Sequence, residues 1–492
     1  MSHSQSPTME NILADLQLGQ PGTPSYERQV KACIQAAESN LARIESQIRD
    51  LTRLRDREEQ LISALKPLVA PIRRVPPELL LEIFHAAFKC DELGWLKQVL
   101  AIASVCGHWR RLACTCPRLW NRLLKVDIQK APSEEYLVIA KTFLERSGVL
   151  PIPVGLHHEH EEAAPLVEYL YTLAPRWVSL YFDSSHIGRL CDLPTDALTT
   201  LKSLTVHSHM EISASSPLQV FLGAPHLRHV FLNVWNLRAF PMPWSQLTTL
   251  TIHCLAEPAQ HYLEILVQCT NVVTVEFMGL RPWSERPPSF SQPVRLEKIQ
   301  KFALEFVVDQ ESEEQPIMPF FSCLALPSLT TLELNYECGT SWSSPDFTLF
   351  QHRSPKIEEF KLHGPDMDIN DLISLVREFS NLVELNLHYC GFDGLDTLTS
   401  ILELFQCSQE IVPVTPRLRR LSILSAVMED LAESVLEKTI SSRWWTGTPP
   451  TPAHVARWES IMITGGKIRT FSQGFVKMMA QFRRDGLRVV VG

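Results

Sequence analysis

Residues 381–390, Asn-Leu-Val-Glu-Leu-Asn-Leu-His-Tyr-Cys, contain the pattern that decides the fold. Leu382, Leu385 and Leu387 follow the spacing apolar-x-x-apolar-x-apolar. Alternation of apolar and polar residues predicts a short strand that buries one of its faces. The segment therefore indicates one unit of a structure that must bury this face against further elements.

The same spacing recurs along most of the chain. It begins again at Trp177, Leu201, Leu227, Leu247, Val272, Ile299, Leu329, Ile357, Leu418 and Trp458. Most starts lie about 20 to 30 residues apart, a period that resembles that of leucine-rich repeats. The Asn or Cys that usually closes such a unit is clear only at Cys390, which indicates irregular repeats.

Helical segments are expected between these strands, at residues 218–222, 259–268, 371–379, 395–405 and 428–441. Repeated strand, helix and parallel strand predict an α/β fold in which residues 124–492 stack into a curved leucine-rich-repeat-like solenoid. A doubly wound α/β sheet and two smaller domains are the alternatives. Neither explains so many matches to one short template.

The alternation also predicts an open face of the solenoid, made of the side chains between and after the buried positions. This face is polar with embedded aromatic and His side chains. Candidate contacts for a target protein are Tyr181, His207, Phe231, His253, Glu333, His363 and His388. His363 and His388 are expected about 4.8 Å apart on adjacent strands. Arg is scarce on this face, which argues against a phosphorylated partner.

Binding at loops, or at the C-terminal end of the solenoid, is the alternative to binding at the open face. Residues 281–293 and the acidic residues 309–315 are expected to be exposed insertions. Either could bind a partner, although a solvated loop is the simpler interpretation.

A second pattern precedes the repeat, in residues 71–123. Pro76 and Pro77 begin a helix, and Leu79, Leu80, Ile83 and Phe84 follow helical spacing. A second helix carries Ile102, Val105, Trp109 and Leu112 in the same way. Two short helices cannot bury this much apolar surface on each other, so we expect a docked partner.

These residues resemble the F-box, in particular the form found in many fungal proteins. The resemblance is carried by residues 75–80, Ile83-Phe84, Val105-Cys106, Trp109-Arg110 and residues 117–120, although the usual Leu-Pro is Val75-Pro76 here. It implies a module that binds the SKP adaptor subunit of a cullin–RING ubiquitin ligase. The implied adaptor contacts are Pro76, Leu79, Leu80, Ile83, Phe84, Val105 and Trp109. An ordinary helical hairpin inside a larger core is the alternative.

The N-terminal part is expected to contain a tail followed by a rod. Residues 1–25 are rich in Ser, Gln, Pro and Gly, which predicts disorder. Residues 26–66 predict a long helix with coiled-coil spacing. Its seam is Ile34, Ala37, Leu41, Ile44, Ile48, Leu51, Arg55, Glu58, Ile62 and Leu65. Self-association through this seam and packing along the next domain are equally compatible with the pattern.

Composition narrows the class of function. A net charge of -9 argues against a dedicated nucleic-acid binder. No phosphate-binding loop, catalytic elbow, metalloprotease helix or dinucleotide turn is found, so we expect no enzyme activity and no cofactor. Residues 157–162 are the best metal candidate, but contiguous ligands seldom converge on one ion, so no metal is expected. Scattered Cys residues and the lack of a leader or membrane span favour the cytoplasm or nucleus.

These patterns together predict a non-enzymatic substrate receptor. The F-box-like module would hold the adaptor, and the solenoid would hold an unknown protein target. A scaffold that uses the same two surfaces, and self-associates without ubiquitin transfer, is the alternative.

Overall fold

The computed structural model describes most of the chain from residue 24 onward. Its described residues are 24–87, 95–121, 124–126, 134–157, 164–208, 217–254, 257–281, 293–307, 319–336, 342, 344–365, 367–390, 395–408, 413–425, 431–445, 455–465 and 470–492. The chain divides into two compact units, Met1–Ala113 and Cys114–Gly492. The expected tail, residues 1–25, lies almost entirely outside the described residues.

The first unit is helical. The long helix α2 spans Pro24–Leu65, and the 3-10 helices η1 (Lys66–Val69) and η2 (Pro71–Arg74) follow it. Pro67 and Pro71 lie in the first turns of η1 and η2, where a missing N–H is tolerated. Three short helices complete the region: α3 (Pro77–Ala87), α4 (Trp95–Val105) and α5 (Gly107–Thr115).

Leu80 and Phe84 form the interior of this helical region. They lie one turn apart on α3 and are 0% and 1% exposed. The ring of Phe84 contacts that of Trp109 on α5, with centroids 4.8 Å apart. Val99 of α4 and Ala113 of α5 are also buried. The module therefore has a small core of its own.

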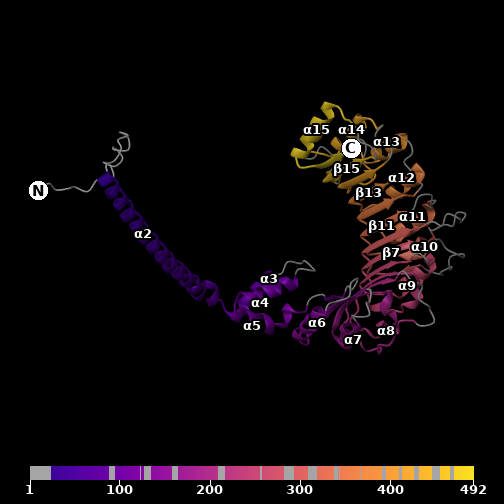
Figure 1. Cartoon of the computed structure of the whole chain (residues 1–492). Helices are drawn as coiled ribbons and strands as arrows, with labels where there is room; N and C mark the ends of the chain where they lie inside the picture. The colour runs from indigo at the N-terminus through magenta and orange to yellow at the C-terminus, as the bar shows by residue number, and fades with distance from the viewer. Residues whose placement is uncertain are drawn as a thin grey trace. The chain divides into compact units, whose positions relative to one another are not determined.

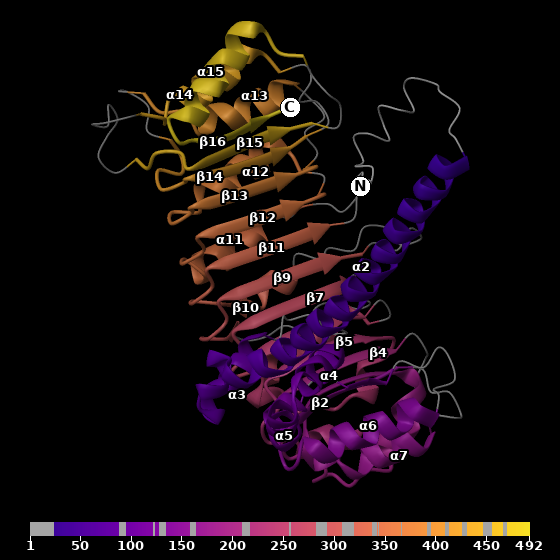
Figure 2. The same cartoon turned by 60° about the vertical axis from the view of Figure 1, so that its left-hand side comes forward.

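The second unit is built on one 14-stranded parallel sheet, whose strands follow one another in chain order (Figures 1 and 2). A two-stranded sheet, β8 (Val294–Arg295) with β10 (Leu324–Ala325), lies outside it. The large sheet contains β1 (Leu124–Val126), β2 (Ile152–Leu156), β3 (Trp177–Asp183), β4 (Ser203–Ser208), β5 (His229–Val234), β6 (Thr249–His253), β7 (Thr274–Leu280), β9 (Lys301–Phe306), β11 (Thr331–Tyr336), β12 (Glu359–His363), β13 (Glu384–His388), β14 (Arg420–Leu424), β15 (Ser460–Thr464) and β16 (Arg488–Val491).

Helices cover the outer side of the curved sheet (Figure 1). They are α6 (Glu134–Arg146), α7 (Ala164–Thr172), α8 (Ile187–Cys191), α9 (Ala259–Gln268), α10 (Pro319–Ser322), α11 (Ser344–Arg353), α12 (Ile369–Arg377), α13 (Leu395–Leu404), α14 (Glu433–Ser441) and α15 (Gln473–Arg484). Short 3-10 helices are η3 (Pro117–Leu119), η5 (Ala174–Arg176), η6 (Ser184–His186), η7 (Gln219–Gly223), η8 (Leu237–Ala239) and η9 (Trp244–Gln246). The segment expected as a helix at residues 218–222 is the 3-10 turn η7.

The predicted α/β solenoid is confirmed by the strand register. Leu362 of β12 pairs with Leu334 of β11 and with Leu387 of β13, so the template's last apolar position is continuous from strand to strand. These Leu side chains are at most 1% exposed. Along each of these strands, the residues that alternate with the buried positions are half-buried. A sheet in strict chain order excludes the doubly wound alternative, whose strand order must reverse.

Different polar side chains donate hydrogen bonds to the backbone carbonyls of the turns between repeats, where regular repeats would use a ladder of Asn side chains. Gln246 donates to the carbonyls of Ala224 and Leu227, at 2.7 and 3.1 Å. Asn381 donates to the carbonyl of Pro355 at 2.9 Å. The buried thiol of Cys390 contacts the carbonyl of Leu362, and burial raises its pKa to about 12. Different residue types therefore bind the backbone carbonyls in different repeats. This explains why the Asn or Cys that usually closes a repeat is clear in the sequence only at Cys390.

Arg443 forms a buried polar centre near the C-terminal end of the solenoid. Its side chain is 0% exposed and lies over the ring of Trp458, 4.4 Å from the centroid. The guanidinium donates to backbone carbonyls of Thr415, Pro416, Leu418 and Ala456. Burial lowers the pKa of Arg443 to about 10, so the side chain remains charged at neutral pH. The side chain of Arg443 therefore connects residues 415–418, which precede β14, to Ala456, which precedes β15.

Candidate functional site

The F-box-like helices present an exposed apolar surface beside their core. Leu79 and Ile83, one turn apart on α3, are 56% and 47% exposed, and Val105 of α4 is 60% exposed. Pro76 is also exposed. We call Leu79, Ile83 and Val105 the apolar patch.

The other residues expected to contact an adaptor lie deeper. Leu80 and Phe84 belong to the interior, and Trp109 is half-buried against Phe84. Residues 79 and 80 differ by 100° around the helix, so one member of each adjacent pair faces inward. Leu100, which is 52% exposed on α4, was not anticipated and adds apolar surface to this module. The sequence predicted the helical module, but it did not predict which of its apolar side chains are buried and which are exposed.

The strand register arranges the side chains of the open face in two columns. Asp183 pairs with His207, and the same column continues through Asn233 to His253. At the other end it continues from Asn335 to His363 and His388. The neighbouring column contains Tyr181, Phe231 and Glu333, in register with Thr205 and Lys361. Between Phe277 and Leu280 the register shifts, so the first column is interrupted at β7.

Four rings lie in successive contact on the open face, and they are here called the aromatic row. Tyr181 lies 4.5 Å from His157 and 5.3 Å from His207, measured between ring centroids. His207 lies 5.2 Å from Phe231, with the ring planes only 29° apart. All four side chains are half-buried, so part of each remains exposed to solvent. A ladder of flat, partly exposed rings favours contact with apolar or aromatic groups of a partner.

His157 joins this row although the sequence suggested it only as part of a possible metal site. Residues 158–162, the rest of that candidate, lie outside the described residues. In the described part of the chain, no group of three His, Cys, Asp or Glu side chains is arranged to hold a metal ion. Among the described residues, none of the helices has an apolar stretch of the length that a membrane span requires.

A second cluster lies at the ends of β12 and β13. His363 pairs in register with His388, and their rings are 6.3 Å apart in an edge-on arrangement. Tyr389, which is 48% exposed, places its ring 5.6 Å from His363. Its φ of 52° is uncommon for a residue other than Gly, and its N–H donates to the carbonyl of Leu424. Sequence alone did not show Tyr389, because it follows the alternating strand.

The pKa of His388 lies below its ordinary value. Partial burial lowers it, and the nearby His363 and Lys361 lower it further. The ring nitrogen Nε2 lies 3.4 Å from the hydroxyl of Ser422. Protonation of His388 is therefore disfavoured in the folded protein.

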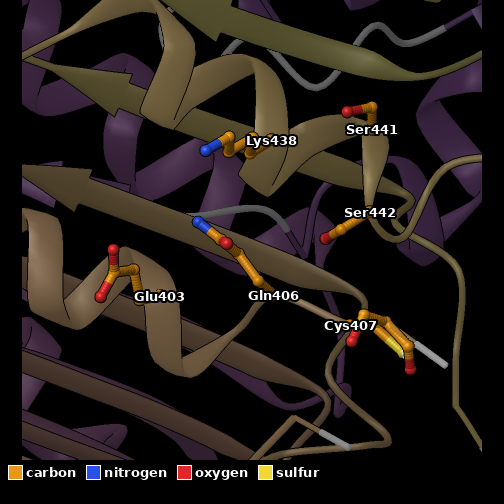
Figure 3. Close-up of a pocket in the computed structure, with 7 residues that line it drawn as sticks. Glu403, Gln406, Cys407, Lys438, Ser441 and Ser442 are labelled. Carbon is orange, nitrogen blue, oxygen red and sulfur yellow. Dashed lines mark hydrogen bonds between the residues drawn. The ribbon is translucent and has the colours of Figure 1, made fainter. Parts of the chain in front are cut away.

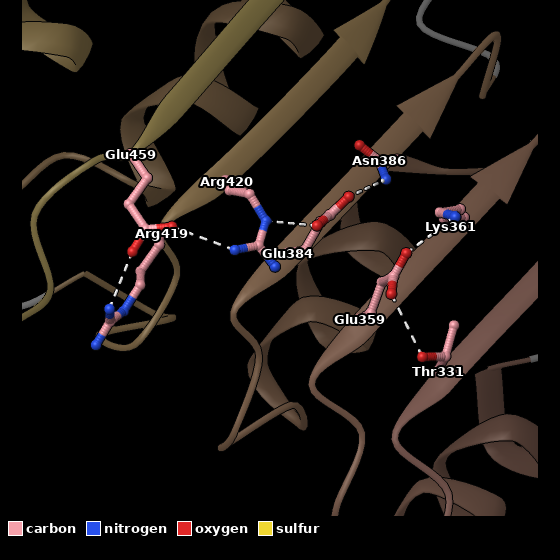
Figure 4. A network of polar contacts seen from close by, with 8 residues as sticks. All are labelled: Thr331, Glu359, Lys361, Glu384, Asn386, Arg419, Arg420 and Glu459. Atoms are coloured by element: carbon pink, nitrogen blue, oxygen red, sulfur yellow. Dashed lines mark hydrogen bonds and ion pairs between the residues drawn. The ribbon is translucent and has the colours of Figure 1, made fainter. Parts of the chain in front are cut away.

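Charged side chains form an ionic ladder across β11 to β15 (Figure 4). Arg420 lies 2.5 Å from Glu384 and 3.2 Å from Glu459, and Arg419 is 3.0 Å from the second oxygen of Glu459. Lys361 lies 2.9 Å from Glu359 and 3.7 Å from Glu333. Glu333, one of the candidate target contacts, is thus held within the sheet by its own neighbour.

The pKa shifts in the ladder agree with mutual neutralisation. Partial burial would raise the pKa of Glu384, but hydrogen bonds from Arg420 and Asn386 outweigh it and lower that pKa. A hydrogen bond with Glu359 raises the pKa of Lys361. Because these charges already have partners, a ligand that competes for them gains little.

A cleft of about 510 Å³ opens on the helical side, between α13 and α14 (Figure 3). Glu403, Gln406, Cys407, Lys438 and Ser442 line it. Burial raises the pKa of the Cys407 thiol, which keeps it protonated and poorly nucleophilic at neutral pH. Gln406 is engaged with the hydroxyl of Thr439 at 3.1 Å. The cleft has room for a small ligand, and Cys407 in its lining is not an activated nucleophile.

A polar relay lies at a smaller cleft of about 160 Å³ near α9. His261 contacts Glu257 through Nδ1 and Arg238 through Nε2. An Arg guanidinium can only donate, so Nε2 accepts and the Nδ1–H donates to the carboxylate. This arrangement holds the His261 ring between Glu257 and Arg238 and fits a structural role.

Comparison with known proteins supports the F-box resemblance of the helical module. Residues 72–125 match the family model described as F-box-like. No curated protein matches the sequence. Among solved structures, the leucine-rich repeat-containing protein LegL7 from Legionella pneumophila is similar at 10% identity and a TM-score of 0.30, over 61% of this chain and 94% of that chain. The chain thus carries an F-box-like domain, and its own strand pairing gives a leucine-rich-repeat-like solenoid.

Proposed function

We propose that the chain is the substrate-recognition subunit of an SCF-type cullin–RING ubiquitin ligase. The F-box-like domain binds an SKP-type adaptor, and the solenoid binds a protein target. The chain itself contributes no catalytic group in this proposal, since ubiquitin transfer belongs to the other subunits. The F-box-like match at residues 72–125 supports the adaptor half of the proposal.

The apolar patch is the single observation that carries this proposal. Leu79, Ile83 and Val105 are about half exposed although their helices have a separate core around Phe84. Burying three such side chains contributes about 1.5 to 3 kcal/mol each at most, which is a substantial share of a stable interface. A hairpin with only a structural role has no need of this surface.

The open face of the solenoid supports the target half. The aromatic row offers stacking surface, whereas the ionic ladder is already neutralised within the sheet. We therefore place the main target contact on β2 to β5 and assign it to an unphosphorylated segment with apolar or aromatic side chains. A phosphopeptide would need Arg side chains that are free to bind, and Arg419 and Arg420 are engaged with Glu459 and Glu384.

Affinity capture of the full chain, followed by mass spectrometry, tests the proposal. We expect adaptor, cullin and RING subunits in the captured material, together with a protein that is lost from the Tyr181→Ala, Phe231→Ala double variant. The matched control replaces Leu222, which is 50% exposed on η7, with Ala. Recovery of no ligase subunit by a folded chain contradicts the proposal.

A scaffold that self-associates without ubiquitin transfer is the second candidate. The exposed apolar side chains of α2 favour it, because they provide a surface for a second copy. Recovery of the adaptor alone, or of the chain alone, would support the scaffold over the ligase receptor.

A further inference from the structure

The long helix α2 exposes an apolar seam that its own unit does not cover. Heptad spacing places Ile34, Leu41 and Ile48 at one seam position, and Ile44 and Leu51 at the other. Their exposed fractions lie between 46% and 66%. Ile62 and Leu65 continue the seam and are 49% and 50% exposed. Such an exposed apolar row on a 42-residue helix indicates an interaction surface.

Two charged residues interrupt the seam, and they decide how a second helix fits. Arg55 and Glu58 occupy consecutive seam positions and are both exposed. In a parallel pair of identical helices, each seam residue meets its own copy. Arg55 would then face Arg55, and Glu58 would face Glu58. Both layers would place like charges together, at a cost in stability.

An antiparallel pair places opposite charges together. With the twofold axis between Asp56 and Arg57, Arg55 of one copy lies opposite Glu58 of the other, and the symmetry repeats this layer. The layers on either side then match Leu51 with Ile62 and Ile48 with Leu65. In this register the two charged positions form two layers of opposite charge, and apolar layers lie on both sides of them.

The residues flanking the seam favour the same arrangement. Leu54 and Leu61, which are 55% and 50% exposed, occupy the same flanking heptad position. Antiparallel helices bring this position of one copy beside the same position of the other, so Leu54 contacts Leu61. Parallel helices would instead place Leu54 beside Glu59 of the second copy. The apolar surface is therefore wider where the seam itself is charged.

The N-terminal half of the second helix also meets apolar surface. Beyond the paired layers, its Leu41 and Ile44 run past the C-terminal end of α2. There η1 and η2 expose Leu68, Val69 and Ile72, at 57%, 74% and 39%. The antiparallel register thus uses exposed apolar side chains on both sides of Leu65.

We propose that the chain self-associates through α2 as an antiparallel dimer whose axis lies between Asp56 and Arg57. This inference does not depend on ubiquitin transfer or on adaptor binding. Arg55 also lies 2.6 Å from Asp56 and 3.7 Å from Glu59 of its own helix.

Charge reversal tests the proposed pairing in the full chain. Light scattering should report a dimer for the parent, and either R55E or E58R alone should raise the dimer dissociation constant roughly tenfold, because both central layers then hold like charges. The double variant R55E/E58R should restore dimerisation. Circular dichroism checks that helix content is unchanged. A monomeric parent, or single variants that dimerise as the parent does, would overturn the proposal.

Cysteine crosslinking tests the orientation independently. The antiparallel register brings L51C of one copy against I62C of the other, so the double variant should form a covalent dimer on oxidation. L51C alone should not, because its two copies are separated by about 16 Å along the helix axis. The parent under the same oxidant controls for the native thiols. Efficient crosslinking of L51C alone would show parallel helices and would reject the assignment.

Discussion

Phe84 and Trp109 pack against each other with ring centroids 4.8 Å apart, while Ile83, the preceding residue, remains 47% exposed. Neighbouring residues of α3 therefore have different roles. Phe84 stabilises the helical module, and Ile83 belongs to the exposed surface that we propose for partner binding. The two roles can be separated by mutation.

The first prediction concerns the interior of the module. Phe84→Ala should lower the free energy of unfolding of the F-box-like helices by about 3 to 5 kcal/mol, because it removes a fully buried ring and leaves a cavity. Ile83→Ala is the matched control and should change stability by less than about 1 kcal/mol. Thermal unfolding of both variants measures the difference. Equal losses would show that the assigned core and surface are not distinct.

The second prediction concerns Arg443. Arg443→Met keeps much of the apolar bulk over Trp458 but removes the donors to four backbone carbonyls. We expect a loss of about 3 kcal/mol or more in unfolding free energy, since buried acceptors lose their partners. Arg457→Met is the control, because Arg457 also stacks on a Trp ring but is exposed. Denaturant unfolding with an unchanged midpoint for Arg443→Met would contradict this role.

The third prediction concerns the pH dependence of stability. His388 has a pKa below its ordinary value in the folded protein, so the unfolded chain binds a proton first as pH falls. Stability should therefore decrease as pH drops through about 6.5, until the folded-state pKa is passed. His388→Gln should flatten the profile between about pH 7.5 and 5.5. His226→Gln, at an exposed site, is the control, and identical profiles for parent and His388→Gln would refute the prediction.

The fourth prediction concerns the ionic ladder. Arg420→Gln should reduce the unfolding free energy by about 1 kcal/mol or less at low salt, because the Arg420 and Glu384 side chains are partly exposed, at 43% and 23%. The difference should shrink at high ionic strength. Arg417→Gln is the control, because Arg417 donates to the neutral side chain of Asn381. A difference that does not depend on salt would argue against an electrostatic role.

Much of the solenoid could be predicted because a strand has a period of two. Each template match fixed both the strand and the face that it buries, and the register of His363 with His388 followed. Three strands of the described 14-stranded sheet were missed for physical reasons. Pro153 and Gly155 make β2 look like a turn, and β1 and β16 are too short to show alternation.

The candidate sites could be predicted less completely. Leu79, Leu80, Ile83 and Phe84 are all apolar and lie on adjacent faces of α3, so periodicity could not tell which pair faces inward. Arg443 was missed because a single Arg at a helix end ordinarily indicates surface. The aromatic row depends on diagonal contacts between strands, such as Tyr181 with His207, and only the register reveals these.

Titration of the full chain with a purified SKP-type adaptor tests the central claim most directly. Calorimetry should show saturable binding to the parent, and the Leu79→Glu, Ile83→Glu double variant should weaken it at least about a hundredfold, because two charges would enter an apolar interface. The Leu222→Glu variant, altered at a distant exposed site, should bind as the parent does. Absence of binding by a folded parent, or undiminished binding by the folded double variant, would contradict the account.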